Sequence, residues 1–360
     1  MELQNYLRTA GLKKLAYEYS IKVNRHSKID NLVCLKYSQL ESPMEETVVQ
    51  QCRGIILDEA NNWEIVSYPY DKFFNYGESH APKLDWDTAQ LYEKLDGSLM
   101  TLYYYQGEWR VQSSGMADAT GEVNGFGCTF GELFWKVWHD KNYQQPRETN
   151  CCFMFELMTP YNRIVVRQNK NNLVLHGVRD RLTLKEADPQ LWGDKYGWEV
   201  VKTYPLQTLK EIIELTDKLD PMKSEGYIVC DREFKRIKIK SPNYVAIAHL
   251  KTGFSSRRIL EIVVTNEGEE FLNYYPEWQE LYSQIEAKYN ELVISIEAEY
   301  RQHQDIIEQK DFAIAVKHLP YSGILFNLRK GKTQSVKESL AQTSIHKLES
   351  LLKIDFVELG

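Results

Sequence analysis

Short runs rich in β-branched and aromatic residues recur between turn residues from about residue 31 to residue 240. They predict strands at 31–37, 53–58, 63–68, 99–105, 108–113, 151–157, 163–167, 173–178, 226–230 and 236–240. Such side chains fit the pleated surface of a sheet, and turns this closely spaced favour antiparallel pairing. Apolar positions three and four apart instead predict helices at about 129–139 and 206–219. The mixture indicates the α+β class.

After about residue 250 the pattern becomes helical. Apolar side chains then recur at gaps of three and four over residues 277–310, at Trp278, Tyr282, Ile285, Tyr289, Leu292, Ile296 and Tyr300. This spacing gathers them on one face of a long amphipathic helix. We therefore predict a domain boundary near residue 250, with a mixed domain over residues 1–250 and an all-helical domain over residues 251–360.

Composition places the chain among ordinary folded proteins. Of its 360 residues, 43% are hydrophobic and 26% are charged, which excludes disordered, collagen-like and low-complexity classes. The formal charge is −7, so a nucleic acid would have to bind at local basic patches. One candidate is the acid-free segment 312–337, which contains Lys317, Arg329, Lys330, Lys332 and Lys337. Solvated helix charge is the alternative interpretation.

Neither secretion nor membrane insertion is indicated by the sequence. The six cysteines form no CxxC pair, and we expect them to be reduced and buried. The N-terminus is charged throughout, and no uncharged run approaches the ~18 to 20 residues that a membrane span needs. We expect a soluble cytoplasmic protein, in the host cytoplasm if the source is viral, with no membrane partner.

Candidate chemistry begins with the run Glu93–Leu99, EKLDGSL, which leads into the predicted strand 99–105. In one interpretation it is a charged turn, in which Asp96 and Gly97 reverse the chain and Lys94 is solvated. In the other, the lysine is a nucleophile, which must lose its proton before attacking phosphorus and so needs cationic neighbours or a metal. Side chains 94 and 96 would then point into one pocket from a strand end, and Gly97 would permit close approach of the backbone.

A pair of lysines has the same two-residue spacing as Lys94 and Asp96. Lys238 and Lys240 alternate with Ile237 and Ile239, so a strand would set both ammonium groups against one polar cavity. Such a pair would neutralise phosphate charge. An exposed amphipathic edge strand is the alternative interpretation.

Further blocks follow the lysine run along the chain. They are Phe155-Glu156-Leu157 with Pro160 to Ile164, Glu225 to Val229, and Lys238-Ile239-Lys240 with Tyr244. This order resembles motifs I, III, IV and V of the covalent nucleotidyltransferases. Two upstream blocks, CRGII at 52–56 and DKFFN at 71–75, narrow the resemblance to the RNA ligase 1 family, the ATP-dependent phage tRNA-repair ligases. The resemblance extends from Arg53 to Tyr244, and the helical C-terminal third is also that family's arrangement.

The resemblance implies a role for each position. Lys94 would be the nucleophile that carries AMP, and the other catalytic residues would be Asp96, Lys238 and Lys240. The nucleotide would be bound by Arg53 and Lys72, both at the β- and γ-phosphates, and by Phe74, Gly97, Glu156, Lys238, Lys240 and Tyr244. Glu225 would hold the water shell of a catalytic Mg²⁺ (or Mn²⁺).

Some of these roles have alternatives. The resemblance assigns Glu156 to the ribose hydroxyls, but an ion pair with Arg163 would also explain a carboxylate in an apolar run. Phe74 could simply belong to the core. Some relatives carry a further lysine past the nucleophile, where this chain has Ser113 and Ser114, so the contact of that lysine stays unassigned.

The implied fold is a nucleotidyltransferase (ATP-grasp-like ligase) domain of antiparallel sheets with flanking helices, followed by an all-helical C-terminal domain with a role in tRNA specificity. The implied enzyme is an ATP-dependent RNA ligase that joins 5′-phosphate and 3′-hydroxyl RNA ends through lysyl-AMP and RNA-adenylate intermediates. Its implied partners are RNA, in particular tRNA with a broken anticodon loop, and a separate polynucleotide kinase/phosphatase that heals the ends. Alternatives are a DNA ligase, a capping guanylyltransferase, or a noncatalytic RNA-binding protein on a ligase scaffold.

Overall fold

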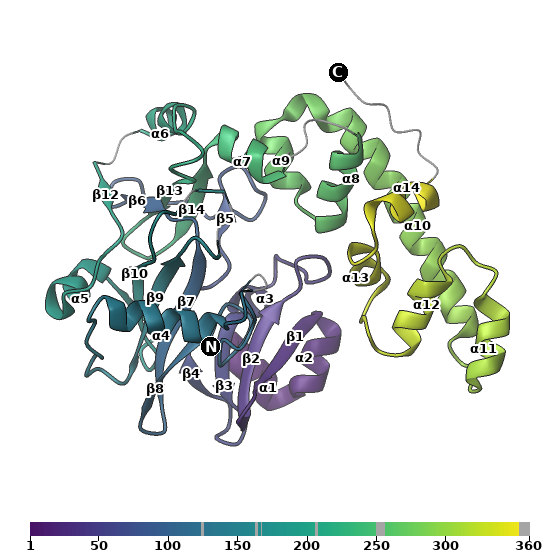
Figure 1. Ribbon diagram of the computed structural model, residues 1–360, viewed down its shortest axis with the longest axis horizontal. Helices are drawn as coiled ribbons and strands as arrows, with labels where there is room; N and C mark the ends of the chain where they lie inside the picture. The colour runs from purple at the N-terminus through teal and green to yellow at the C-terminus, as the bar shows by residue number, and fades with distance from the viewer. Residues whose placement is uncertain (124–125, 163–164, 167, 206–207, 250–255, 353–360) are drawn as a thin grey trace. The chain divides into compact units, whose positions relative to one another are not determined.

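The computed structural model describes residues 1–123, 126–162, 165–166, 168–205, 208–249 and 256–352. The chain divides into two compact units. One consists of Met1–Ser38 with Ser42–Ala248, and the other of Gln39–Glu41 with His249–Gly360. The first contains the sheets and the second is helical (Figure 1).

A four-stranded antiparallel sheet begins the first unit, in the order β1-β2-β3-β4 within the described residues. Its strands are Ile21–His26, Ile29–Tyr37, Arg53–Asp58 and Glu64–Ser67. The helices α1 (Glu2–Ala10), α2 (Leu12–Glu18) and α3 (Thr47–Gln51) pack on one face of this sheet, because Leu3, Leu7 and Leu15 share a buried cluster with Val33 and Ile55.

A five-stranded antiparallel sheet follows, in the order β11-β10-β9-β7-β8 within the described residues. In that order the strands are Glu186–Ala187, Asn172–Asp180, Cys151–Met158, Ser98–Tyr105 and Glu108–Ser113. Helix α4 (Phe130–Asp140) starts at a capping box in which Thr129 and Glu132 satisfy each other's backbone N–H groups. Helix α5 (Pro189–Tyr196) also packs on this sheet.

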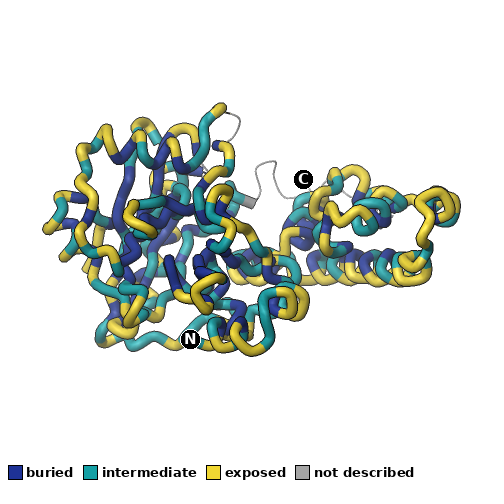
Figure 2. Tube along the Cα trace, turned by 90° about the horizontal axis from the view of Figure 1, so that it is seen from below, coloured by how far each residue is buried: buried dark blue, intermediate teal, exposed yellow. Residues whose placement is uncertain are grey.

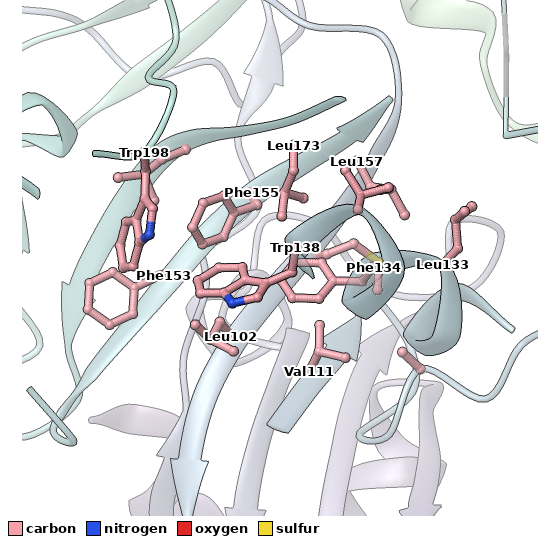
Figure 3. Close-up of a cluster of buried hydrophobic side chains, with 14 of the residues drawn as sticks. Leu102, Val111, Leu133, Phe134, Trp138, Phe153, Phe155, Leu157, Leu173 and Trp198 are labelled. Atoms are coloured by element: carbon pink, nitrogen blue, oxygen red, sulfur yellow. The ribbon is translucent and has the colours of Figure 1, made fainter. Parts of the chain in front are cut away.

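The main core lies between α4 and this sheet. Figure 3 shows the rings of Phe134 and Trp138 meeting Phe153, Phe155 and Trp198. Odd-numbered residues of β9 enter this aromatic cluster, whereas Cys152 and Met154 enter another cluster on the opposite face of the strand. The alternation leaves Glu156 on that opposite face.

The third sheet has the strand order β12-β6-β13-β14-β5 within the described residues. In that order the strands are Thr203–Tyr204, Gln90–Lys94, Gly226–Cys230, Arg236–Lys240 and Phe74–Asn75. The pair β14·β5 is parallel and the others are antiparallel. Helix α6 (Leu209–Thr216) packs on it through Ile212, and helix α7 (Pro242–His249) follows β14. In Figure 2 the interior of the first unit is largely dark blue and many of its outer loops are yellow.

The regular secondary structure of the second unit is helical within its described residues. After α8 (Ser256–Thr265) and α9 (Gly268–Tyr274), a short 3₁₀ turn at Pro276–Trp278 leads into the long helix α10 (Gln279–His303). Tyr282, Ile285, Tyr289 and Ile296 of the predicted stripe are buried. The remaining helices are α11 (Gln309–Val316), α12 (Ser322–Arg329), α13 (Val336–Ala341) and α14 (Ile345–Leu352).

Arg329 of the basic segment has a structural position in this unit. Its guanidinium donates to the carbonyl oxygens of Ile306 at 2.6 Å and Ile307 at 2.7 Å, and it lies 4.5 Å from the centre of the Phe312 ring. These contacts fix the turn between α10 and α11, where the helix expected over 277–310 ends early. Lys317, Lys330 and Lys332 are exposed.

The α+β class is confirmed. Most predicted strands agree with the observed ones within a residue or two, but the one over 163–167 is wrong for its described residues, Val165 and Val166, which lie outside any strand. Residues 163, 164 and 167 lie outside the described residues. Sequence patterns missed β1, β6 and the two N-terminal helices.

Where the structure describes the chain, the cysteines are free thiols and all except Cys128 are buried. No helix in this part of the chain is both long and apolar enough to cross a membrane.

Candidate active site

A cavity of about 330 Å³ in the first unit brings together polar side chains that are far apart in the sequence. They come from β3, β6, β9, β10 and β14, which belong to all three sheets. The charged and titratable ones include Arg53, Lys94, Glu156, His176, Arg236, Lys238 and Lys240. Gly97 and Ser114 also line the wall.

Lys94 is the last residue of β6 and lies beside a buried carboxylate. Its Nζ is 2.7 Å from Oε2 of Glu225, and its side chain is 19% exposed. The other oxygen of Glu225 is 3.7 Å from Nζ of Lys240. The register explains this arrangement, because Gly226 pairs with Lys94 on one side and with Lys240 on the other. Glu225 therefore lies between two lysines at the end of three adjacent strands.

Gly226 makes this close approach possible. Its φ is +147°, and a Cβ at this position would lie 2.2 Å from the carbonyl oxygen of Ile239. No L-residue fits there without moving the backbone of β14. Gly97 is similar, since a Cβ there would lie 2.4 Å from the carbonyl oxygen of Leu157.

Strand β14 presents its cations to the cavity in the predicted alternation. Ile237 and Ile239 are buried at 4% and 2% exposure, while Lys238 and Lys240 line the cavity. Arg236 belongs to the same face and also lines it. The alternation in RIKIK could have identified Arg236 from the sequence as well.

Phe73 lies among three of these cations. Its ring centre is 4.7 Å from the Arg53 guanidinium, 5.8 Å from that of Arg236 and 5.7 Å from the Lys238 ammonium. Cations over an aromatic face are stabilised by the ring quadrupole. The Phe73 ring thus offsets part of the electrostatic repulsion among these three cations.

The expectation that Asp96 points into the cavity is wrong. Strand β6 ends at Lys94, so the pleat that would place residues 94 and 96 on one side does not continue. Asp96 is 3% exposed, and its Oδ2 accepts hydrogen bonds from the backbone N–H of Val165 at 2.9 Å and of Val166 at 2.6 Å. The carboxylate holds the chain after β9 against the loop that follows Lys94.

Three predicted nucleotide ligands do not appear among the described residues that line this cavity. Lys72 and Phe74 line an adjacent cavity of about 590 Å³. The Lys72 ammonium lies 5.3 Å from the ring centre of Phe74, which is itself 5% exposed. Tyr244, at 3% exposure, packs with Val165 and Val166 in an apolar cluster.

Glu156 does line the cavity, and its Oε2 lies 3.4 Å from Nε2 of His176. Arg163, the alternative partner, lies outside the described residues. Ser114, one of the two serines found where some relatives have a lysine, accepts a hydrogen bond from Nζ of Lys36 at 3.2 Å. Sequence reasoning missed His176 and its neighbour Tyr70, for which the local pattern gives no signal.

Together, the three sheets enclose a cavity lined by lysine and arginine, in which Lys94 lies beside the buried carboxylate of Glu225. This is the arrangement expected of a nucleotidyltransferase. The family described as RNA ligase matches residues 51–244, which is more than half of the chain. The chain belongs to this RNA ligase family, as the sequence motifs predict.

Individual relatives agree with this membership. An RNA ligase of Rhodothermus phage RM378 is 26% identical over 324 residues, which cover 72% of this chain and 73% of the relative. A protein of Autographa californica nuclear polyhedrosis virus, named as a bifunctional polynucleotide kinase/RNA ligase, is 25% identical over 98% of this chain. The match covers 53% of that relative, so the chain spans about half of its length.

Solved structures of other RNA ligases are similar at lower levels. An archaeal ATP-dependent RNA ligase has a TM-score of 0.47 at 12% identity and covers 90% of each chain. A Naegleria gruberi RNA ligase with ATP and Mn has a TM-score of 0.34 at 15% identity, covering 45% of this chain and 51% of the other.

Proposed function

We propose that the protein is an ATP-dependent RNA ligase that joins 5′-phosphate and 3′-hydroxyl ends through lysyl-AMP and RNA-adenylate intermediates. The observation that carries this proposal is the position of Lys94, whose Nζ lies 2.7 Å from Glu225 and at the wall of a cavity shared with Lys238, Lys240 and Arg53. A lysine held beside a proton acceptor and among phosphate-binding cations is suited to attack a nucleotide phosphate.

In the first step, Nζ of Lys94 attacks the α-phosphorus of ATP. A P–N bond forms while the bond to the pyrophosphate oxygen breaks, and pyrophosphate leaves. Glu225 is the nearest carboxylate to the ammonium and accepts the proton that Nζ loses. Lys238 and Lys240 stabilise negative charge on the phosphate oxygens.

The next two steps move AMP from the lysine to RNA. A 5′-phosphate oxygen of RNA attacks the phosphorus of lysyl-AMP, which breaks the P–N bond and returns the amine. The 3′-hydroxyl oxygen of a second end then attacks the RNA 5′-phosphorus. A phosphodiester P–O bond forms, the P–O bond to AMP breaks, AMP leaves, and the hydroxyl proton passes to solvent. Dividing the reaction in this way gives each step a good leaving group.

Other residues bind the nucleotide. We assign Glu156 to the ribose hydroxyls, because its carboxylate faces the same cavity as Lys94. Arg53 is assigned to the β- and γ-phosphates. Lys72 lies in the adjacent cavity. Phe73 and Arg236 line both cavities, so Lys72 would have to reach a phosphate past these two side chains.

Glu225 also fits a divalent cation that keeps most of its waters. Among the described residues there is no group of three or more His, Cys, Asp or Glu side chains that could enclose a metal. Mg²⁺ is commonly held by one or two carboxylates together with substrate phosphates. Bound beside Glu225, Mg²⁺ or Mn²⁺ would offset negative charge on the phosphates.

The test of this proposal is adduct formation. The protein is incubated with ATP labelled at the α-phosphate and with Mg²⁺, and label that survives denaturation is measured. We expect a labelled protein whose adduct is lost in Lys94→Ala and in Lys94→Arg, with ATP preferred to GTP. Labelling of Lys94→Ala at the wild-type level would refute the assignment, and a preference for GTP would indicate capping chemistry.

We further propose that the natural substrate is a tRNA broken in its anticodon loop, whose ends a separate polynucleotide kinase/phosphatase prepares. The second unit would contribute tRNA specificity through Lys317, Lys330 and Lys332, which are exposed. Replacing these three by glutamine should slow joining of nicked tRNA more than joining of a generic oligonucleotide. Equal loss on both substrates would contradict this role.

A further inference from the structure

A β-bulge in β10 places two consecutive residues on the cavity wall. The pairing of β10 with β9 shifts between Leu175 and Gly177, which lie opposite Phe155 and Met154. His176 is the extra residue of this bulge. Both His176 and Gly177 line the cavity. The flanking residues Leu175 and Val178 both enter the aromatic cluster on the other face of the sheet, so the bulge interrupts the regular alternation of faces here.

Tyr70 holds the imidazole of His176 from one side. Its hydroxyl oxygen is 2.9 Å from Nδ1 and 3.1 Å from the carbonyl oxygen of the same residue. The two rings are stacked, with centres 5.7 Å apart and planes at 20°. Burial raises the pKa of Tyr70 well above its usual value, so the hydroxyl keeps its proton for donation.

Gly177 leaves the space that this contact needs. A Cβ at position 177 would lie 1.8 Å from the Tyr70 hydroxyl oxygen. The bulge, the glycine and the tyrosine therefore fix the ring together. The hydroxyl has a single proton and lies within reach of both the carbonyl oxygen and Nδ1 of His176. In the tautomer whose Nδ1 accepts this proton, Nε2 carries the proton of the neutral imidazole.

That Nε2 faces Glu156. It lies 3.4 Å from Oε2 of the glutamate, is enclosed by protein, and makes no hydrogen bond within the described part of the chain. In that tautomer Nε2 is a buried donor without an acceptor, which is costly, and the Glu156 carboxylate is the acceptor within reach.

From this arrangement we propose that His176 is a positioning residue, which holds the Glu156 carboxylate toward the ribose of the bound nucleotide and so sets discrimination between ribonucleotides and deoxyribonucleotides. Tyr70 in turn fixes the imidazole. The inference rests on the proposed function, in which Glu156 binds the ribose hydroxyls. It adds a chain of contacts, Tyr70 to His176 to Glu156, that reaches the nucleotide only through the glutamate.

The test measures the rate of adduct formation on Lys94 in single turnovers with ATP, 2′-deoxy-ATP and 3′-deoxy-ATP. We expect wild type to prefer ATP, and His176→Leu to lower that preference about tenfold, on the order of one hydrogen bond to a charged group. His176→Gln, whose amide can replace the Nε2 donor, should recover part of the preference. Because His176 acts only through Glu156, the double variant Glu156→Ala, His176→Leu should prefer ATP over the deoxynucleotides as much as Glu156→Ala alone does.

Two further variants test whether the effect is specific to the contacts of His176. His139→Gln changes an exposed histidine at the end of α4 and should leave the preference for ATP unchanged. Tyr70→Phe keeps the ring but removes the hydroxyl, and should lower the preference less than His176→Leu does. It also serves as the second probe if His176→Leu does not fold.

The outcomes separate the inference from the function on which it rests. If wild type forms no adduct with any nucleotide, the proposed function fails and the inference fails with it. If wild type forms the adduct but the His176 and Tyr70 variants keep the full preference for ATP, the inference alone is overturned. Equal slowing with all three nucleotides would likewise overturn it, because it would indicate a merely structural role.

Discussion

Glu186 in β11 is buried between two arginines, and its replacement by glutamine should strongly destabilise the first unit. Its side chain is 4% exposed and accepts hydrogen bonds from Arg179 at 2.7 Å and from both terminal nitrogens of Arg236 at 3.0 and 2.7 Å. Burial alone would raise the pKa of this carboxyl, but the charges and hydrogen bonds of Arg236 and Arg179 hold it below the usual value.

Glutamine would keep the shape of the side chain but remove the counter-charge and turn an NH₂ group toward a guanidinium. Breaking a buried ion pair in this way costs about 3–5 kcal/mol. Asp71 remains 3.3 Å from Arg179 and would still neutralise part of the charge. We therefore expect Glu186→Gln to lower the free energy of unfolding by about 3 kcal/mol, at the lower end of that range.

Urea unfolding followed by tryptophan fluorescence measures this loss, since Trp138 and Trp198 are buried in the same unit. The matched control is Glu214→Gln, which breaks an exposed ion pair with Lys210 on α6 at 3.9 Å. We expect a change below about 0.5 kcal/mol there. A loss below about 1 kcal/mol in Glu186→Gln would refute the reasoning.

The difference in free energy of unfolding between wild type and Glu186→Gln should depend on pH in a definite direction. Because folding lowers the pKa of Glu186 from its ordinary value of 4.5, the carboxylate contributes its full stabilisation above pH 4.5, and the contribution is lost as pH falls through the folded-state pKa. The stability gap between wild type and Glu186→Gln should therefore narrow as pH falls below 4.5. A gap that widens on acidification would contradict the assigned charge state.

Three further substitutions test other parts of the fold. Gly177→Ala would drive a Cβ against Tyr70, so urea unfolding should show a loss of about 1–3 kcal/mol; an unchanged midpoint would mean that the bulge is easily remodelled. Thr129→Ala removes the capping box of α4 and should cost about 1 kcal/mol in the same assay. Arg329→Gln removes two hydrogen bonds to backbone carbonyls and should lower the melting temperature of the helical unit in circular dichroism, whereas Lys332→Gln should not.

The sequence predicted the site best where the backbone is regular. In β14, strict alternation of lysine and isoleucine correctly placed both ammonium groups on the cavity side. Strand β6 was missed although it carries Lys94, because in QLYEK only Leu91 is deeply buried. Its pairing partners are β12 and β13, far along the chain, and a local window of sequence does not contain them.

Asp96, which the sequence misplaced, and His176, which it missed, lie where a strand departs from its regular pleat. At the end of β6 the alternation no longer applies, and Asp96 turns inward because two backbone N–H groups near Val165 are available to a buried carboxylate. At the bulge in β10, His176 and Gly177 both reach the cavity wall. Such irregularities depend on the neighbouring strand, which the local sequence does not specify, and they occur where side chains must be aimed at a site. His176, which strand periodicity fails to place and the bulge brings to the cavity wall, is therefore the first residue to examine for a role at this site.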